Sequence, residues 1–178
     1  MNLGRLVLDS SPLNYFARSN QLEVLAKLVA GSECLITKAV EEELLRGGAK
    51  YAQLYQASAQ PWIRVMDESA LDYLKLFSEY HGRLGRGSRN IGEAATLAYA
   101  EFHNIVAVID DRVGRRHGME RNVKVVGTLD LLCEGVRGGC VTMGEAAEVV
   151  DLLRDHEAFL PCDGIGFVEW ARAEGLLE

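Results

Sequence analysis

Short apolar runs alternate with segments of helical periodicity along the whole chain. The apolar runs at residues 6–8, 34–36, 62–66, 105–109 and 123–126 are typical of buried strands. Apolar residues at three- and four-residue intervals predict two helices that begin near Leu13 and Leu22, the second ending at Gly31. Further helices are predicted in the segments 38–46, 71–80, 91–102, 128–136, 143–154 and 164–177. Strands that alternate with helices indicate an α/β fold with a mostly parallel central sheet covered on both faces.

The polar residues between these runs predict where the helices begin and end. Ser10 or Ser11 is expected to cap the first helix, with Pro12 in its first turn. Thr37 and Thr128 are expected caps of two later helices. The segment 82–90 holds three glycines and three arginines and is expected to be a loop.

Length and composition favour one folded domain. The chain has 178 residues, of which 48% are hydrophobic, 25% are charged and 3 are proline, which argues against a disordered or fibrous protein. No apolar run approaches the length that spans a bilayer, and the first nine residues do not resemble a signal peptide, so we expect a cytoplasmic protein without a membrane partner. The four cysteines lack zinc-site spacing and are expected to be free thiols.

Charge is distributed unevenly along the chain. The formal net charge is −7, the wrong sign for a protein that coats nucleic acid. The segment 82–124, however, has eight basic and five acidic residues, a balance of +3. A basic island with its own carboxylates could attract phosphates and hold a metal, although charged loops are more often solvated surface.

Acidic residues follow or flank the predicted strands. Asp9 ends the first strand, and Asp110 and Asp111 end the strand at 105–109. Glu43 and Glu93 lie near the starts of helices beside these strands. Because ligands of parallel sheets gather at the carboxyl ends of strands, these acids are expected to approach one rim. Crowded carboxylates repel unless a cation neutralises them, and all-oxygen ligation favours Mg²⁺ or Mn²⁺.

Each acid also has a purely structural interpretation. Asp9 could be a helix cap, Glu43 part of a solvated acidic run, and Glu93 a partner of the helix dipole. The pair Asp110 and Asp111 could serve only a turn. The residues alone leave both interpretations open.

Four short motifs, in order along the chain, resemble those of the PIN-domain nucleases. They are the strand and aspartate at 6–13, the Glu-Leu helix at 36–44, the Gly-Glu-Ala helix at 90–98, and the aspartate pair followed by arginines at 108–115. The third and fourth are similar to those of the VapC-like toxins of toxin–antitoxin pairs. The resemblance covers about residues 5–140 and implies a three-layer α/β/α sandwich, with 1–140 as the nuclease core. Residues 141–178 are then a C-terminal helical extension packed on the same domain.

The resemblance also implies a reaction and the residues for it. The activity would be Mg²⁺- or Mn²⁺-dependent hydrolysis of phosphodiester bonds in single-stranded RNA. Asp9, Glu93 and one of Asp110 or Asp111, with Asp111 slightly favoured, would be the main ligands, and Glu43 would hold a second ion or orient water. Ser11 would support these ligands, either through a hydrogen bond or as a direct oxygen partner. Four arginines would bind the substrate phosphates: Arg112, Arg115, Arg116 and Arg89.

Partners and rival functions stay open. A VapB-like antitoxin is implied by the resemblance, and a homodimer could form through the helices near Leu13 and Leu22, although such helices usually pack on their own sheet. One rival is a PIN-like module that binds RNA or protein without cleavage, and another is an RNA-processing nuclease that is no toxin. A phosphotransfer domain would need a lysine at a strand end, whereas Lys124 lies within a predicted strand.

Overall fold

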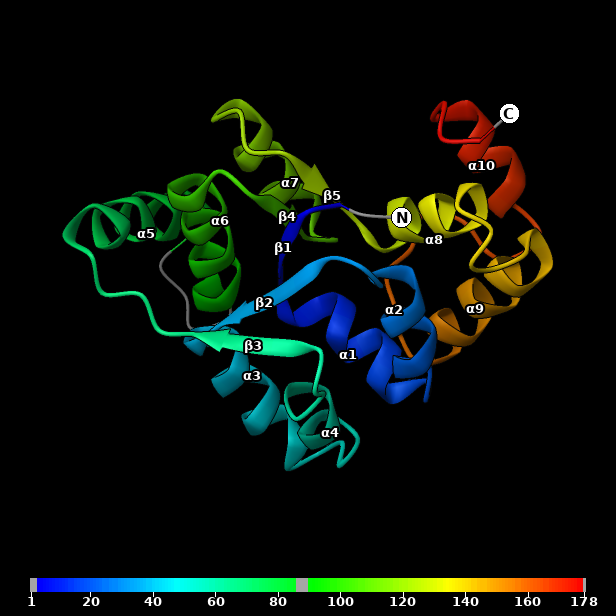
Figure 1. Ribbon diagram of the computed structural model, residues 1–178, viewed down its shortest axis with the longest axis horizontal. Coiled ribbons are helices and arrows are strands. Elements are labelled where there is room, and N and C mark those ends of the chain that lie inside the picture. The colour runs from blue at the N-terminus through cyan, green and yellow to red at the C-terminus, as the bar shows by residue number, and fades with distance from the viewer. Residues whose placement is uncertain (1–2, 86–89, 178) are drawn as a thin grey trace.

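The structure is a computed structural model that describes residues 3–85 and 90–177. Among the described residues, five strands alternate with helices, as the hydrophobic pattern predicts (Figure 1). The strands are β1 (Arg5–Leu8), β2 (Glu33–Thr37), β3 (Ile63–Met66), β4 (Val106–Val108) and β5 (Val125–Val126). The helices are α1 (Ser10–Arg18), α2 (Leu22–Leu28), α3 (Lys38–Gly48), α4 (Leu54–Ser58), α5 (Leu71–Leu84), α6 (Ile91–His103), α7 (Arg112–Glu120), α8 (Thr128–Arg137), α9 (Met143–Asp155) and α10 (Phe167–Ala173).

All the strand pairs of the sheet are parallel, in the order β3-β2-β1-β4-β5. The first strand lies in the middle, and its register with β4 pairs Leu6 with Val106 and Leu8 with Val108. The chain runs outward from β1 to β3 and then crosses back to β4 on the other side of β1. Strand order therefore reverses between β1 and β4, the position where open α/β sheets bind ligands.

Alternate residues of the central strand point into two separate cores. Leu6 and Leu8 pack in a cluster with side chains of α1, α2 and α8, whereas Val7 packs with α5 and α6 on the other face. Continuous burial on both faces is what an apolar run in a parallel strand requires. The result is the expected three-layer α/β/α fold (Figure 1).

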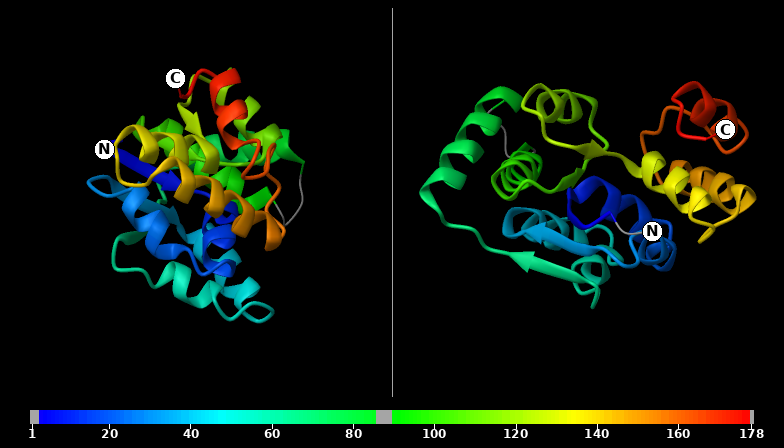
Figure 2. Two further views of the ribbon diagram at one scale, coloured as in Figure 1. Left: turned by 90° about the vertical axis from the view of Figure 1, so that its right-hand side faces the viewer. Right: turned by 45° about the horizontal axis from the view of Figure 1, so that its top comes forward.

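The C-terminal segment shares the larger of the two cores. Val150 and Leu153 of α9 and Phe167 of α10 are fully buried in the cluster that contains Leu6 and Leu13. Figure 2 shows α9 alongside α8, with α10 stacked beyond them. Leu13 is buried in the same cluster as the strand residues Leu6 and Leu8. Among the described residues, no helix combines the length and apolarity that a membrane crossing needs.

Several predicted boundaries are wrong. Helix α5 continues to Leu84, so 82–84 are helical rather than part of a loop, and 86–89 lie outside the described residues. Strands β4 and β5 and helix α10 are shorter than predicted. Helix α7 was not predicted, because it contains two glycines, Gly114 and Gly118, which have low helix propensity. Its four charged residues also leave few apolar positions to show helical periodicity. Helix α4 was also missed.

Two helix caps differ from the prediction, and in both cases the residue involved is an acid of the predicted site or its hydrogen-bond partner. Asp9, rather than Ser10 or Ser11, caps α1, and its carboxylate accepts a hydrogen bond from the Ser11 amide. Gly127 precedes α8, so Thr128 is its first residue rather than its cap. The predicted cap Thr37 is confirmed, since its hydroxyl accepts from the Val40 amide.

Candidate active site

Asp9 is fixed at the carboxyl end of β1, next to the end of β4. Its amide donates to the Val108 carbonyl at 3.0 Å, which continues the β1–β4 ladder by one residue. The residue is 4% exposed. Burial raises the pKa of its carboxyl, and this effect exceeds that of the hydrogen bonds from Ser10 and Ser11, which lower the pKa. The carboxylate is therefore held in place but poorly solvated.

Glu43 links two helix N-termini that lie far apart in sequence. It projects from α3, and its Oε2 accepts from the Ser10 hydroxyl of α1 at 2.9 Å. Its Oε1 accepts from the Gly92 amide in the first turn of α6, also at 2.9 Å. A Cβ at position 92 would lie 2.6 Å from Oε2, so the close approach requires glycine. Burial raises the pKa of Glu43.

Glu93 occupies the centre of the acidic cluster. It lies in the first turn of α6 and is 9% exposed, and its Oε1 is buried with no hydrogen-bond partner among the described residues. Burial, followed by the charges of Asp9 and Asp111, raises the pKa of Glu93 to about 8. This oxygen fills the space that a side chain at Gly114 of α7 would otherwise occupy.

The two adjacent aspartates after β4 have different roles. Asp110 turns toward α8, where the Thr128 amide and hydroxyl donate to it at 2.7 and 2.6 Å. Burial raises its pKa, and the Thr128 hydrogen bonds and the Arg115 charge oppose that rise. Asp111 caps α7 through Oδ1, and its charge is one of those that raise the pKa of Glu93. Asp111 thus belongs to the central cluster, with Asp110 at its edge.

The donor set suits a divalent cation, although the side chains are not arranged around one. Within the described ranges 3–85 and 90–177, no group of three or more His, Cys, Asp and Glu could hold a metal ion as it stands. Amides and hydroxyls engage one oxygen each of Asp9 and Asp111 and both oxygens of Glu43. The unpartnered Oε1 of Glu93 and the crowding of like charges are what a Mg²⁺ or Mn²⁺ ion would relieve.

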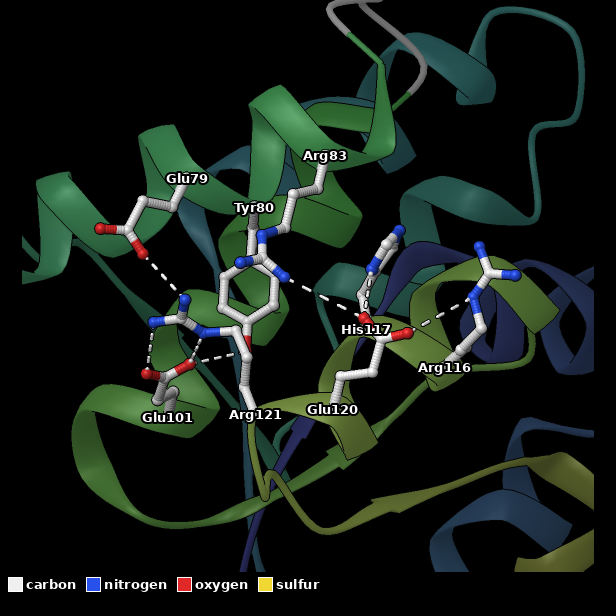
Figure 3. Close-up of polar contacts among 8 residues, drawn as sticks. All are labelled: Glu79, Tyr80, Arg83, Glu101, Arg116, His117, Glu120 and Arg121. Atoms are coloured by element: carbon white, nitrogen blue, oxygen red, sulfur yellow. Dashed lines mark hydrogen bonds and ion pairs between the residues drawn. The ribbon is translucent and has the colours of Figure 1, made fainter.

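The predicted phosphate-binding arginines separate onto different faces of α7. Arg112 is exposed beside Asp110 and Asp111, where it lines the cavity described below. Arg115 pairs with Asp130 of α8 at 2.8 Å. Arg116 pairs with Glu120 at 3.9 Å, in the ion-pair network that Figure 3 shows between α5, α6 and α7. Arg89 lies outside the described residues.

A cavity of about 310 Å³ opens beside the aspartates. Its lining includes the predicted Ser11, and two aromatic residues that sequence reasoning missed, Tyr15 of α1 and Phe159. Burial and the Asp110 charge raise the pKa of the Tyr15 hydroxyl. Tyr15 follows Ser11 by four residues, one turn of α1, a signal that could have found it, whereas no motif marks Phe159.

Another cavity, of about 660 Å³, lies at the opposite edge of the sheet, among the amino ends of the strands. It is lined by Arg5, Val106 and Lys124, among others. Lys124 precedes β5, rather than lying within a strand as predicted, and is at the wrong edge to serve an acceptor aspartate at Asp9 or Asp110. The phosphotransfer function is therefore not supported.

The sheet is parallel, has the strand order 3-2-1-4-5 and carries clustered carboxylates at its switch point. The family model described as a PIN domain, DUF3368, matches residues 5–165. The chain therefore belongs to the PIN-domain family, whose members are generally nucleases. The match extends through α9. A search of curated proteins found no match.

Proposed function

We propose that the protein is a divalent-cation-dependent endoribonuclease that hydrolyses phosphodiester bonds in single-stranded RNA. One observation carries the proposal: Glu93 meets Asp9, Asp111 and Glu43 at the switch point of the sheet. The negative charge of the rest of the molecule disfavours long duplex contacts and favours exposed single strands. A cytoplasmic location would suit such a substrate.

Asp9, Glu93 and Asp111 would hold the cation, and Glu43 would position water from its anchored place between Ser10 and Gly92. Bound Mg²⁺ or Mn²⁺ would supply positive charge for the phosphate oxygens and lower the pKa of water. Arg112 would bind a substrate phosphate at the rim.

The direct test uses purified protein, labelled single-stranded RNA, and Mg²⁺ or Mn²⁺ with and without EDTA. We expect cleavage that EDTA abolishes. The double variant Asp9→Asn, Glu93→Gln should lose activity by at least about 100-fold while remaining folded, because the lost carboxylates would hold the cation that stabilises the transition state. The matched control is Glu148→Gln, an exposed acid of α9. Full activity in the double variant would refute the mechanism.

One specific observation favours a second function, a PIN-like domain that binds RNA or protein without cutting it. In the described residues the carboxylates already satisfy helix caps and hydroxyls, and no ready metal group exists. In that case, labelled RNA would bind but stay intact at every Mg²⁺ and Mn²⁺ concentration, and Glu93→Gln would leave RNA affinity unchanged.

We also propose that the biological role is that of a toxin neutralised by a small VapB-like antitoxin. The support is the likeness of the third and fourth acidic motifs, at 90–98 and 108–115, to the VapC-like branch. Induced expression should arrest growth, whereas Glu93→Gln should not. Normal growth with an active nuclease would favour an RNA-processing role. Homodimerisation stays a prediction.

A further inference from the structure

Phe159, between α9 and α10, is 94% exposed beside the candidate active site. A single exposed aromatic residue is common and by itself indicates nothing. Phe159, however, lines both the 310 Å³ cavity at the aspartates and a second cavity of about 690 Å³. The two cavities share Asp110, Arg112 and Phe159, so they meet at this side chain.

The backbone around Phe159 is anchored although its ring is not. Ala158 is buried in the main core, and Leu160 packs against that core. The Leu160 amide donates to the Ala158 carbonyl at 3.2 Å, and the Arg154 guanidinium donates to the Leu160 carbonyl at 3.4 Å. The Phe159 amide also interacts with the Tyr15 hydroxyl and lowers the pKa of that group. The ring is therefore presented from a fixed position.

The groups around the ring match the parts of one nucleotide. An aromatic face that projects into solvent can stack on any base, because every base has a π-face. Arg112, exposed at the junction of the two cavities, offers a guanidinium to a phosphate. The carboxylate cluster begins at Asp110 and Asp111 in the same lining. A protruding aromatic ring next to a cation suits a base followed by its phosphate.

We propose that Phe159 is a base-stacking platform for the nucleotide next to the scissile phosphate, and that Arg112 binds the phosphate between that base and the carboxylates. The proposal rests on the proposed function and deepens it, because a stacked base must be unpaired. Single-stranded RNA would then be selected by the C-terminal segment rather than by the acidic motifs. Phe159 is a binding residue and takes no part in the chemical step.

The test measures binding separately from cleavage. In a Glu93→Gln background with Mg²⁺, the affinity for a short fluorescent single-stranded RNA is compared with that for the same strand made abasic. We expect Phe159→Ala to weaken binding of the base-bearing strand roughly 5- to 150-fold, the range of base–aromatic stacking. The abasic strand should bind both forms equally. Phe159→Trp should restore affinity.

Ile165→Ala is the matched control, because Ile165 is 93% exposed in the same segment but lines neither cavity. It should leave RNA affinity unchanged. Thermal melting of each variant should match the parent, since both side chains are exposed. In the Glu93-containing protein, Phe159→Ala should raise KM for RNA and leave kcat within about twofold.

The outcomes separate this inference from the proposed function. If the wild-type protein cleaves RNA and Phe159→Ala binds and cleaves as well as wild type, the stacking platform is refuted and the nuclease stands. If binding depends on Phe159 and on the base, yet Mg²⁺ and Mn²⁺ never support cleavage, the platform stands and hydrolysis is refuted. If single-stranded RNA does not bind at all, both fail.

Discussion

At the scale of single residues, the acids of this protein differ in what balances their charge. Glu43 and Asp110 receive hydrogen bonds at both oxygens, whereas Glu93 keeps one buried oxygen without a partner in the described chain. Away from the site, Glu101 receives both Arg121 and the Tyr80 hydroxyl (Figure 3). Incomplete pairing makes Glu93 the strongest candidate for direct ligand binding, whereas the hydrogen bonds to Glu43 hold that side chain in place.

Glu101 allows a prediction of pH dependence. The Arg121 hydrogen bonds, at 2.7 Å, lower the pKa of the Glu101 carboxyl below its usual 4.5. A lowered folded-state pKa means that the stabilisation is complete above about pH 4.5 and is lost as the pH falls through the folded value. Glu101→Gln should therefore lower the free energy of unfolding by about 1–2 kcal/mol at pH 7. The difference from wild type should shrink as the pH falls below about 4.5.

Urea denaturation at several pH values measures this difference. Glu148→Gln, on the exposed side of α9, is the control and should show no such dependence. A destabilisation of Glu101→Gln that stays constant down to pH 3 would show that the loss is one of packing and not of charge.

At the scale of elements, α7 connects the site to the rest of the fold. Its N-terminus is capped by Asp111, its Gly114 lies against Glu93, and its Gly118 faces Leu97 and Val125. Each glycine costs about 0.5–1 kcal/mol relative to alanine inside a helix. The absence of two Cβ atoms is what lets α7 approach α6 and β5 so closely.

Gly114→Ala tests this close approach. The new Cβ would overlap Oε1 of Glu93, so Glu93 must move. We expect destabilisation by about 1–3 kcal/mol, as for an overpacked core, and a loss of RNA cleavage of at least about tenfold. Gly144→Ala in α9, where a Cβ has nothing within 4 Å, should instead stabilise by about 0.4–1 kcal/mol and keep activity. Equal behaviour of the two variants in melting and cleavage assays would contradict the packing argument.

The arginines of α7 give a second prediction at this scale. Arg112 lines the cavities at the site, whereas Arg116 pairs with Glu120 toward α5. Arg112→Ala should weaken RNA binding and reduce the slope of log K against log salt by about one, as for one lost phosphate contact. Arg116→Ala should leave the slope unchanged. Fluorescence anisotropy over a salt series measures both, and a reversed order would exclude Arg112 from the phosphate path.

At the scale of the whole molecule, the layered fold and the meeting of distant acids follow from the sequence pattern. The apolar runs at 6–8, 34–36 and 105–109 predict the parallel sheet that is observed. The carboxyl ends of parallel strands share one edge of the sheet, which predicts Asp9 near Asp110 and Asp111. Helix α7 could not be predicted in this way, because Gly114 and Gly118 have low helix propensity. Glycine is required at these positions because side chains of other elements leave no room for a Cβ atom.

The separation of Asp110 from Asp111 was also beyond the sequence. The sequence predicts Thr128 as the cap of α8, whereas its hydroxyl donates to Asp110. This hydrogen bond depends on how α8 packs against the end of β4, which the sequence pattern does not show. Phe159 could not be predicted for the same reason: it has no motif, and its position depends on how Ala158 and Leu160 pack on the core.

Because the C-terminal segment shares the core that contains Leu6, we expect it to unfold together with the rest of the domain. Phe167 is fully buried in the cluster with Leu6, and its replacement by alanine should cost about 3–5 kcal/mol. Circular dichroism and hydrogen exchange in β1 should both report the loss in a single transition. Ile165→Ala, at an exposed position two residues earlier, should change stability by less than about 0.5 kcal/mol. If β1 keeps its wild-type protection in Phe167→Ala, the segment unfolds independently.

The sheet order has a consequence for biosynthesis. The central strand β1 is translated well before its neighbour β4, which begins only at Val106 and is followed by Asp111. At about 5–20 residues per second, a ribosome needs several seconds to make that stretch. Throughout that interval Asp9 has no partner strand on one side, so an unfinished polypeptide holds an incomplete set of acids. Catalytic competence would therefore arise late in translation, and prematurely terminated products that end before Asp111 should be harmless to cellular RNA.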